Sequence, residues 1–401
     1  MPAVVDLIIV GLGAVGSAAL YQAAKLKARV VGIDRFAPPH EYGSSHGDTR
    51  ITREAIGEGR EFVPLVLRSH EIWEELEDAT ARSLMTRNGG LVLASRDMPG
   101  QHHGSRSFVQ DTIDAAREFR IAHEVLSASE IQHRYPQFRL RGDELAYFEP
   151  GAGFVRPEAC IQAQIDLARQ AGAKVAFNET VIRIGPSASG TIEVQTNQGS
   201  YSAGHLILTA GAWIPKLLSG QQQHLFRVHR QTMCWFALSG NRDPYLPENF
   251  PIFIWITGNR PQDMMYGFPA IDDAEAVKMA TELYATTTDP DDVPREVEEA
   301  EVSRLYQEYI APRFPDVSAE CVRRETCLYT VTPDARFIVD TIPGIENTCF
   351  ASACSGHGFK HSAALGEALA RHALQQPALV DLSNFSLSRF ERGNKPAQAG
   401  S

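Results

Sequence analysis

Three glycines near the N-terminus have the spacing of a dinucleotide-binding turn. Gly11, Gly13 and Gly16 directly follow an apolar run and precede a segment rich in alanine and leucine. Two of these glycines let the backbone approach a pyrophosphate, the third lets helix and strand pack closely, and the helix N-terminus supplies N–H donors. Asp34 ends the next apolar run, where its carboxylate can accept a hydrogen bond from a ribose hydroxyl. The pattern predicts dinucleotide binding and leaves FAD and NAD open.

The elements that would position these residues are a strand at 6–10, a helix at 17–27 and a strand at 29–33. A later apolar strand runs into a small-residue turn that contains Gly211 and Trp213. In a nucleotide-binding fold, such a turn lets the chain pass beside the bound cofactor. The alternative for this turn is an ordinary strand end with a glycine cap.

A second kind of pattern begins in the middle of the chain. Residues 226–269 form short runs of alternating and aromatic residues, which are typical of strands in an antiparallel sheet. The sequence therefore predicts an α/β fold, α+β overall, with a second, antiparallel sheet. Its 401 residues suit two or three domains.

Composition limits the partners that we expect. The formal net charge of −11 argues against nucleic acid or an anionic membrane surface as the main partner. We expect no signal peptide and no membrane span, and hence a cytoplasmic location. The six cysteines are scattered without metal-ligand spacing, so we expect neither a disulfide framework nor a metal site. Residues 395–401 are expected to form a flexible tail.

Arg50 and Arg53 lie three residues apart in a polar stretch at 43–53. On a helix, this spacing would place both guanidinium groups on one side. Composition alone favours a solvated helix face here.

Several short stretches are specific enough to be compared with a known family. They are His46-Gly47-Asp48-Thr49-Arg50, Gly57-Glu58-Gly59-Arg60, Tyr266-Gly267-Phe268-Pro269, Phe337-Ile338-Val339-Asp340 and Ser355-Gly356-His357-Gly358-Phe359-Lys360. Together and in this order, they resemble the amine-oxidising flavoproteins of the D-amino acid oxidase superfamily, within it the monomeric sarcosine oxidase and N-methyltryptophan oxidase branch. The resemblance spans nearly the whole chain and implies a monomer that binds FAD.

The resemblance also implies how the domains are arranged. A discontinuous, Rossmann-like FAD-binding domain would take residues 1–85, 150–220 and 320–390. It would be interleaved with a substrate domain of residues 86–149 and 221–319, built on the antiparallel sheet. The further FAD contacts that the resemblance implies are Arg35, Ser44, Val181, Gly211, Trp213, Gly356, Gly358, Phe359 and Lys360.

By the same resemblance, Cys327 is expected to join the flavin covalently, although a single cysteine can also be a buried thiol. Tyr329, two residues on, would line the pocket if this stretch is extended. Arg53 and Lys360 match the positions that bind the substrate carboxylate, since an ammonium and a guanidinium can together hold both oxygens. A lysine just before a helix is otherwise usually solvated.

Four further residues complete the expected catalytic site. Arg50 would lie over the flavin with His46 beside it, and Tyr266 would stand in the pocket. Lys278 follows the Tyr266 motif at the family's distance, where a lysine promotes reaction with dioxygen. The alternative is an exposed lysine on an edge strand.

One residue departs from the family pattern. Four residues beyond Lys278, the family places a histidine, whereas this chain has Glu282. A carboxylate there would repel the substrate's own carboxylate or pair with a cationic group on the substrate, so sarcosine is not a secure substrate. A register shift of a few residues would place Tyr284 or Thr281 there instead.

We therefore expect an FAD-dependent amine oxidase. It would oxidise a secondary or N-methyl amino acid with O2 and water to the demethylated amino acid, formaldehyde and hydrogen peroxide. The first alternative is an oxidase of another amino compound on the same scaffold, such as a primary amino acid, a cyclic imino acid or a larger amine. An NAD-dependent dehydrogenase and a flavin-binding subunit without catalysis are the alternatives from other classes.

Overall fold

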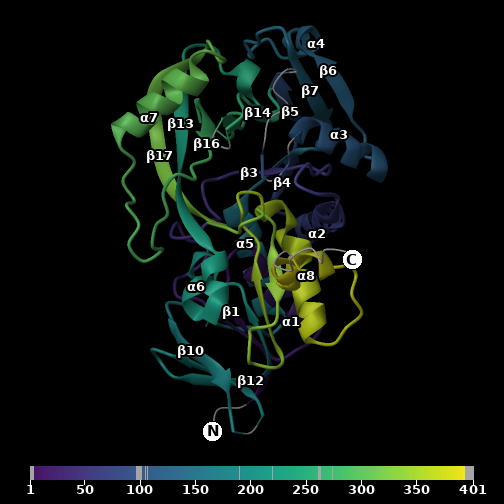
Figure 1. Cartoon of the computed structure of the whole chain (residues 1–401), viewed down its shortest axis with the longest axis vertical. Coiled ribbons are helices and arrows are strands. Elements are labelled where there is room, and N and C mark those ends of the chain that lie inside the picture. The colour runs from purple at the N-terminus through teal and green to yellow at the C-terminus, as the bar shows by residue number, and fades with distance from the viewer. Residues whose placement is uncertain are drawn as a thin grey trace, which may run out of the picture. The chain divides into compact units, whose positions relative to one another are not determined.

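The computed structural model describes residues 4–95, 102–103, 105, 107–188, 190–218, 220–260, 263–272 and 274–392. The predicted flexible tail at 395–401 lies outside this part of the chain. The described residues form a mixed α/β structure with two compact units (Figure 1). The first unit combines residues from 1–45, 160–227 and 330–401, and the second combines residues from 46–159 and 228–329.

Both units contain helices and strands. The helices are α1 (Ala14–Lys25), α2 (Val63–Thr80), α3 (Phe108–Phe119), α4 (Ala128–Arg134), α5 (Pro157–Gln170), α6 (Ile214–Leu217), α7 (Glu299–Leu305), α8 (Ser362–Ala373) and α9 (Ser388–Arg392). The strands are β1 (Val5–Val10), β2 (Val30–Ile33), β3 (Arg50–Thr52), β4 (Met85–Arg87), β5 (Gly90–Ser95), β6 (Glu124–Ser127), β7 (Glu144–Glu149), β8 (Gly153–Val155), β9 (Lys174–Ala176), β10 (Val181–Pro186), β11 (Ile192–Thr196), β12 (Ser200–Leu208), β13 (Arg227–Leu238), β14 (Ile252–Ile256), β15 (Met264–Gly267), β16 (Ala276–Thr281), β17 (Val317–Val331), β18 (Ile338–Asp340) and β19 (Thr348–Ser352).

The first unit is built on a sheet in the order β10-β11-β12-β1-β2-β9, with β19 beside β12 and β18 beside β19. The strands β12, β1, β2 and β9 are parallel, as the predicted strand–turn–helix–strand requires. Helices α1 and α8 lie side by side (Figure 1), and a Cβ on Gly366 of α8 would overlap the Ala18 side chain of α1. The predicted Rossmann-like part of the fold is confirmed.

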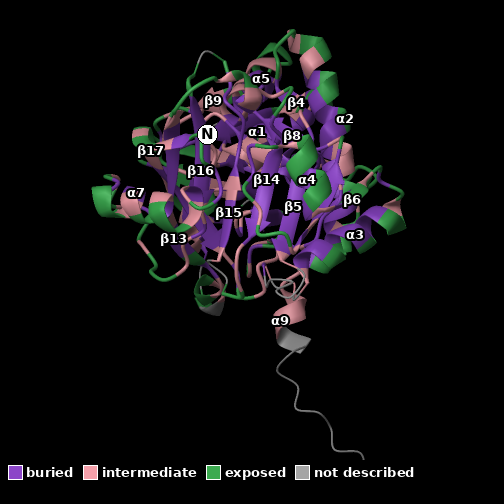
Figure 2. Ribbon diagram, turned by 90° about the horizontal axis from the view of Figure 1, so that it is seen from above, coloured by how far each residue is buried: buried purple, intermediate pink, exposed green. Residues whose placement is uncertain are grey.

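The second unit contains a largely antiparallel sheet in the order β17-β13-β16-β15-β14-β5-β7-β6. One face carries a large apolar core, and Figure 2 shows the central strands as buried. Strand β16 alternates, so that Val277 and Met279 enter this core while Lys278 and Ala280 project to the opposite face. The predicted antiparallel sheet is confirmed, and its alternation separates an apolar face from a face that carries polar residues.

The structure excludes two of the alternatives that composition left open. Arg50 opens the strand β3, which pairs with β8, so the stretch around it is not a solvated helix. Lys278 lies on β16, between β13 and β15, and is buried, so it is not an exposed residue of an edge strand.

The compact units do not coincide with the predicted domains at every boundary. Residues 46–85 and 150–159 pack within the second unit. Which unit binds FAD and which binds substrate stays a prediction. Among the described residues, no helix combines the length and apolar character needed to cross a bilayer.

Candidate active site

The glycine turn of the first unit has the features that a pyrophosphate needs. Gly11 has a φ of +88°, and a Cβ on Gly16 would overlap the Gly11 carbonyl oxygen. A Cβ on Gly13, in contrast, would meet nothing within 4 Å. Helix α1 has no side-chain N-cap and no acidic residue in its first turn, so no side chain competes for its N-terminal N–H groups. This loop can hold the pyrophosphate of a dinucleotide.

Asp34 lies at the end of β2, where the sequence predicts a ribose ligand. Its Oδ2 accepts the Leu12 N–H at 2.6 Å and its Oδ1 accepts the Phe36 N–H at 2.8 Å. Burial raises the pKa of this carboxyl to about 6. Each oxygen has a second lone pair, so the fixed carboxylate can still accept a bond from a ribose hydroxyl.

The turn after β12 lies against the glycine loop. Thr209 Oγ1 donates to the Gly11 carbonyl oxygen at 2.8 Å, and Gly211 has a φ of +53° with open space where its Cβ would be. The Arg35 guanidinium lies 5.8 Å from the Trp213 ring centroid. The structure thus brings Arg35, Gly211 and Trp213 to the region of the glycine loop, and their contacts with a cofactor stay predictions.

Four predicted FAD residues lie between β19 and α8. Gly356 has a φ of +86°, and a Cβ on Gly358 would overlap the Ala353 carbonyl oxygen. Phe359 begins a 3-10 turn that leads into α8. Lys360 is buried, and its Nζ donates to the His357 carbonyl oxygen at 2.9 Å, so it is not a solvated lysine.

Two other predicted FAD residues lie in the first unit. Ser44 is in the loop that ends the unit's first segment, and Val181 begins β10. Just before β10, the Glu179 N–H donates to the Asp34 carbonyl oxygen at 3.0 Å. Val181 therefore lies two residues from a backbone contact with Asp34, the predicted ribose ligand.

In the second unit, four predicted residues are electrostatic neighbours. Arg50 interacts with Cys327, Tyr329 and Tyr266, which raise its pKa on balance although burial opposes its charge. Burial, followed by the charge of Cys327, raises the pKa of Tyr266, and Tyr329 is a hydrogen-bonding neighbour. Cys327 and Tyr329 lie two residues apart on β17, so they share one side of that strand as predicted.

Lys278 projects from the same face of the antiparallel sheet as Tyr266, because Tyr266 pairs with Ala280 and Ala280 lies two residues from Lys278 on β16. Its Nζ donates to the carbonyl oxygens of Gly47 at 2.6 Å and Thr49 at 2.7 Å, and it lies 4.3 Å from the Phe268 ring centroid. Burial, and next the charge of Arg50, lower the pKa of Lys278 well below its usual value. The structure therefore fixes the Lys278 amino group near Arg50.

Arg53 is buried and held from one side. Its Nη2 donates to Glu58 Oε2 at 2.5 Å, its Nη1 donates to the Ala55 carbonyl oxygen, and its guanidinium lies 5.3 Å from the Phe108 ring centroid. Its Nε finds no acceptor among the described residues. A buried donor of this kind is costly unless a ligand satisfies it, so Arg53 has a group to offer an anion.

His46 lies beside Glu325, which is on β17 two residues before Cys327. Its Nδ1 is 3.4 Å from Glu325 Oε2, and its buried Nε2 has no hydrogen-bond partner among the described residues. Hydrogen bonds from His46 and Arg323 outweigh the effect of burial and lower the pKa of Glu325 to about 2.

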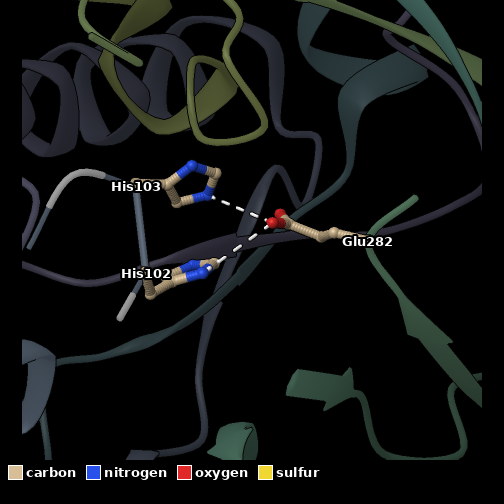
Figure 3. A group of neighbouring side chains, drawn as sticks. All are labelled: His102, His103 and Glu282. Carbon is tan, nitrogen blue, oxygen red and sulfur yellow. Dashed lines mark ion pairs between the residues drawn. The ribbon is translucent and has the colours of Figure 1, made fainter. Parts of the chain in front are cut away.

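Glu282 follows β16 and is buried, with two histidines beside it that the sequence did not reveal (Figure 3). Tyr284 also contacts it, because the Tyr284 hydroxyl donates to Glu282 Oε2 at 2.6 Å. Burial would raise the pKa of Glu282, but the neighbouring His103 contributes most to lowering it to about 2. The carboxylate of Glu282 therefore has partners within the protein, which the sequence analysis did not foresee.

Sequence reasoning missed His102 and His103, gave Glu58 no role of its own, and named Tyr284 only as an alternative to Glu282. The pairing of Glu58 with Arg53 has a weak sequence signal, because Glu58 lies within the compared Gly57–Arg60 stretch and Arg53 lies only five residues before it. The two histidines carry no signal, since their partner lies far along the chain.

Comparisons with known proteins cover both units. A family model described as FAD dependent oxidoreductase matches residues 6–372. Monomeric sarcosine oxidase of Streptomyces avermitilis is 36% identical over 371 residues, which cover 92% of this chain and 93% of that protein. N-methyl-L-tryptophan oxidase of Salmonella heidelberg is 33% identical over 389 residues, which cover 96% and 99%.

A solved structure has a similar fold. NikD, described as an unusual amino acid oxidase essential for nikkomycin biosynthesis, gives a TM-score of 0.81 at 23% identity. The match covers 95% of this chain and 97% of that one. At this identity, the likeness shows the fold alone.

Proposed function

The chain belongs to the family of FAD-dependent oxidoreductases, and on that premise we propose that it is an oxidase of a secondary or N-methyl amino acid. It would convert the amino acid, O2 and water to the demethylated amino acid, formaldehyde and hydrogen peroxide. The names of the two relatives support this substrate class. The observation that carries the proposal is Lys278, a buried lysine whose Nζ is held by the Gly47 and Thr49 carbonyl oxygens near Arg50, on the face of the sheet opposite the apolar core.

When bound, FAD would accept a hydride from the carbon next to the substrate nitrogen. Gly11, Gly13 and Gly16 would hold its pyrophosphate, and Asp34 would bind its ribose. Cys327 would attach the flavin covalently, which retains the cofactor irrespective of its concentration and withdraws electron density from it. This attachment is supported by the burial of Cys327 and by its proximity to Arg50.

Arg53 would bind the substrate carboxylate. Glu58 and the Ala55 carbonyl oxygen fix one edge of its guanidinium, and its Nε remains as a donor. A fixed donor orients the substrate and so selects which C–H bond is presented for oxidation. Lys360 is proposed as a further carboxylate ligand because of the family resemblance.

Lys278 would serve the reaction with dioxygen. Its ammonium is held in place by two carbonyl oxygens, so it needs no rearrangement to stabilise the negative charge that develops on O2. Arg50 would provide a second positive charge in the same region and favour the reduced cofactor, with His46 close by. Tyr266 and Tyr329 would line the pocket as neutral phenols, because burial is the main factor that raises the pKa of each.

The second candidate is an oxidase of another amino compound, such as a primary amino acid, a cyclic imino acid or a larger amine. Glu282 favours it, because a buried carboxylate occupies a position where the resemblance implies a histidine. His103 and Tyr284 share the charge of this carboxylate, so its repulsion of a substrate carboxylate is weaker than the sequence alone implies.

The test measures oxygen uptake, peroxide and formaldehyde with a panel of sarcosine, N-methyltryptophan, proline, pipecolate and lysine. Equal amounts of peroxide and formaldehyde from an N-methyl amino acid would support the proposal. Peroxide without formaldehyde from proline or pipecolate would favour the second candidate, and no oxygen uptake with any compound would refute both. Arg53→Gln should raise KM for the active compound, whereas the exposed Arg117→Gln should not. The monomeric state and the cytoplasmic location stay predictions.

A further inference from the structure

Three buried side chains of the second unit meet at one carboxylate oxygen. His103 Nε2 lies 3.4 Å and His102 Nδ1 lies 3.9 Å from Glu282 Oε2. The side chains of all three are 4% exposed, and their candidate ligand atoms lie within 4.8 Å of one another. Figure 3 shows both rings facing the carboxylate from a single segment of the chain.

These separations are long for direct hydrogen bonds. An N–H···O bond brings nitrogen and oxygen to about 2.7–3.2 Å. Around a tetrahedral zinc ion, bonds of about 2.0–2.2 Å place neighbouring ligand atoms roughly 3.3–3.5 Å apart. The 3.4 Å distance between His103 and Glu282 matches a zinc site, and the His102 ring would move closer to both when the ion binds.

The backbone places two consecutive histidines on the same side. In an extended segment, consecutive side chains point to opposite sides. Here the His102 N–H donates to the Ser105 carbonyl oxygen at 3.0 Å, and the Ser105 N–H donates back at 2.9 Å, which closes a tight turn. His103 has a φ of +45°, in the left-handed region that is unfavourable for residues other than glycine. A ligand shared by both rings would offset the cost of this turn.

We propose that His102, His103 and Glu282 bind one divalent transition-metal cation of the zinc type, with a fourth position open to water. Two imidazoles and one carboxylate suit zinc, whereas magnesium and calcium prefer oxygen ligands alone. The Tyr284 hydroxyl, 2.6 Å from Glu282 Oε2, would orient the carboxylate as an outer partner.

The position of the cluster gives the cation a consequence for substrate binding. Glu282 is an electrostatic neighbour of Tyr266 and Tyr329, which belong to the candidate active site. A cation there would turn the repulsion between Glu282 and a substrate carboxylate into attraction. This consequence depends on the proposed function, but the metal site itself does not.

The test is a calorimetric titration of Zn²⁺ into the purified flavoprotein after dialysis against a chelator, with metal content measured independently by mass spectrometry. We expect one zinc per chain. His102→Ala, His103→Ala and Glu282→Gln should each weaken binding at least tenfold, since even outer partners of a metal contribute about 10- to 100-fold. His133→Ala, which removes an exposed histidine of α4, should bind as the native chain does.

His103→Gln controls for damage to the fold, because it keeps a polar side chain of similar length but removes the ring nitrogen, and it should lose zinc as His103→Ala does. Binding is compared among variants with the native FAD content and melting temperature. The proposal is overturned if the native chain takes up no zinc, or if His103→Ala and Glu282→Gln bind it as tightly as the native chain. Zinc uptake is measured without turnover, so the zinc result can be interpreted even if the protein oxidises no amine.

Discussion

Replacing Lys278 by methionine should slow the reaction with dioxygen far more than the reaction with substrate. The native ammonium is buried and donates to the Gly47 and Thr49 carbonyl oxygens, so its charge has a fixed position. Methionine has a similar length and no charge. The variant should still accept electrons from substrate, because the proposed carboxylate ligand Arg53 is held by Glu58 and Ala55 rather than by Lys278.

The size of the effect follows from Coulomb's law. Two unit charges at 4 Å interact by about 4 kcal/mol at an effective dielectric constant of about 20. Each 1.36 kcal/mol changes a rate about tenfold, so full loss of this term corresponds to roughly a thousandfold. Arg50 remains as a neighbouring cation and offsets part of the loss. We therefore expect reoxidation to slow by about 10²- to 10³-fold.

The assay is stopped-flow absorbance of enzyme reduced by substrate without oxygen and then mixed with aerated buffer. Lys174→Met, at an exposed strand position, is the matched control and should reoxidise at the native rate. In the native enzyme, the rate constant should fall as the pH rises through the lowered pKa of Lys278, since deprotonation removes the cation, and the variant should lack this step. A Lys278→Met variant with the native FAD content and an unchanged rate constant would refute the reasoning.

Three further predictions concern other residues. Cys327→Ser should release its flavin on acid precipitation while the native pellet stays yellow; a yellow variant pellet would place the attachment elsewhere. A hydrogen bond with the Cys234 thiol lowers the pKa of Cys321 to about 7, so the rate at which iodoacetamide labels Cys321 should rise through pH 7. Labelling of Cys321 is the part that disappears in the Cys321→Ser variant. A rise only near the usual pKa of a thiol would contradict this prediction. Gly13→Ala should weaken FAD binding without lowering the melting temperature of the apoprotein. Gly16→Ala should weaken FAD binding and also lower that melting temperature, because only the Cβ at position 16 overlaps the backbone. Equal effects of the two substitutions would argue against the assigned pyrophosphate loop.

Much of the fold could be predicted from the sequence because the strongest sequence signals are local. The glycine turn and the apolar runs of β1, β2 and β12 depend on neighbouring residues, and the family resemblance rests on short ordered motifs that the family model and relatives confirm. That family membership also settles the choice between FAD and NAD, which the glycines alone left open.

The parts that the sequence did not reveal depend on distant partners. Arg50 lies on a three-residue strand that exists only because β8 pairs with it. The alternation around Lys278 predicts a strand but cannot say whether that strand is at the edge of its sheet. His102 and His103 meet Glu282 only through a left-handed turn, and consecutive histidines match no metal-ligand spacing.

The most direct test of the proposed oxidase is the flavin absorbance of the purified protein without oxygen, as candidate amines are added one at a time. We predict that an N-methyl or other secondary amino acid bleaches the visible flavin band and that admitting air restores it. A yellow protein that neither sarcosine nor N-methyltryptophan bleaches would contradict the proposed substrate class, and bleaching by proline, pipecolate or lysine alone would favour the second candidate. Bleaching that air does not reverse would contradict the role of an oxidase.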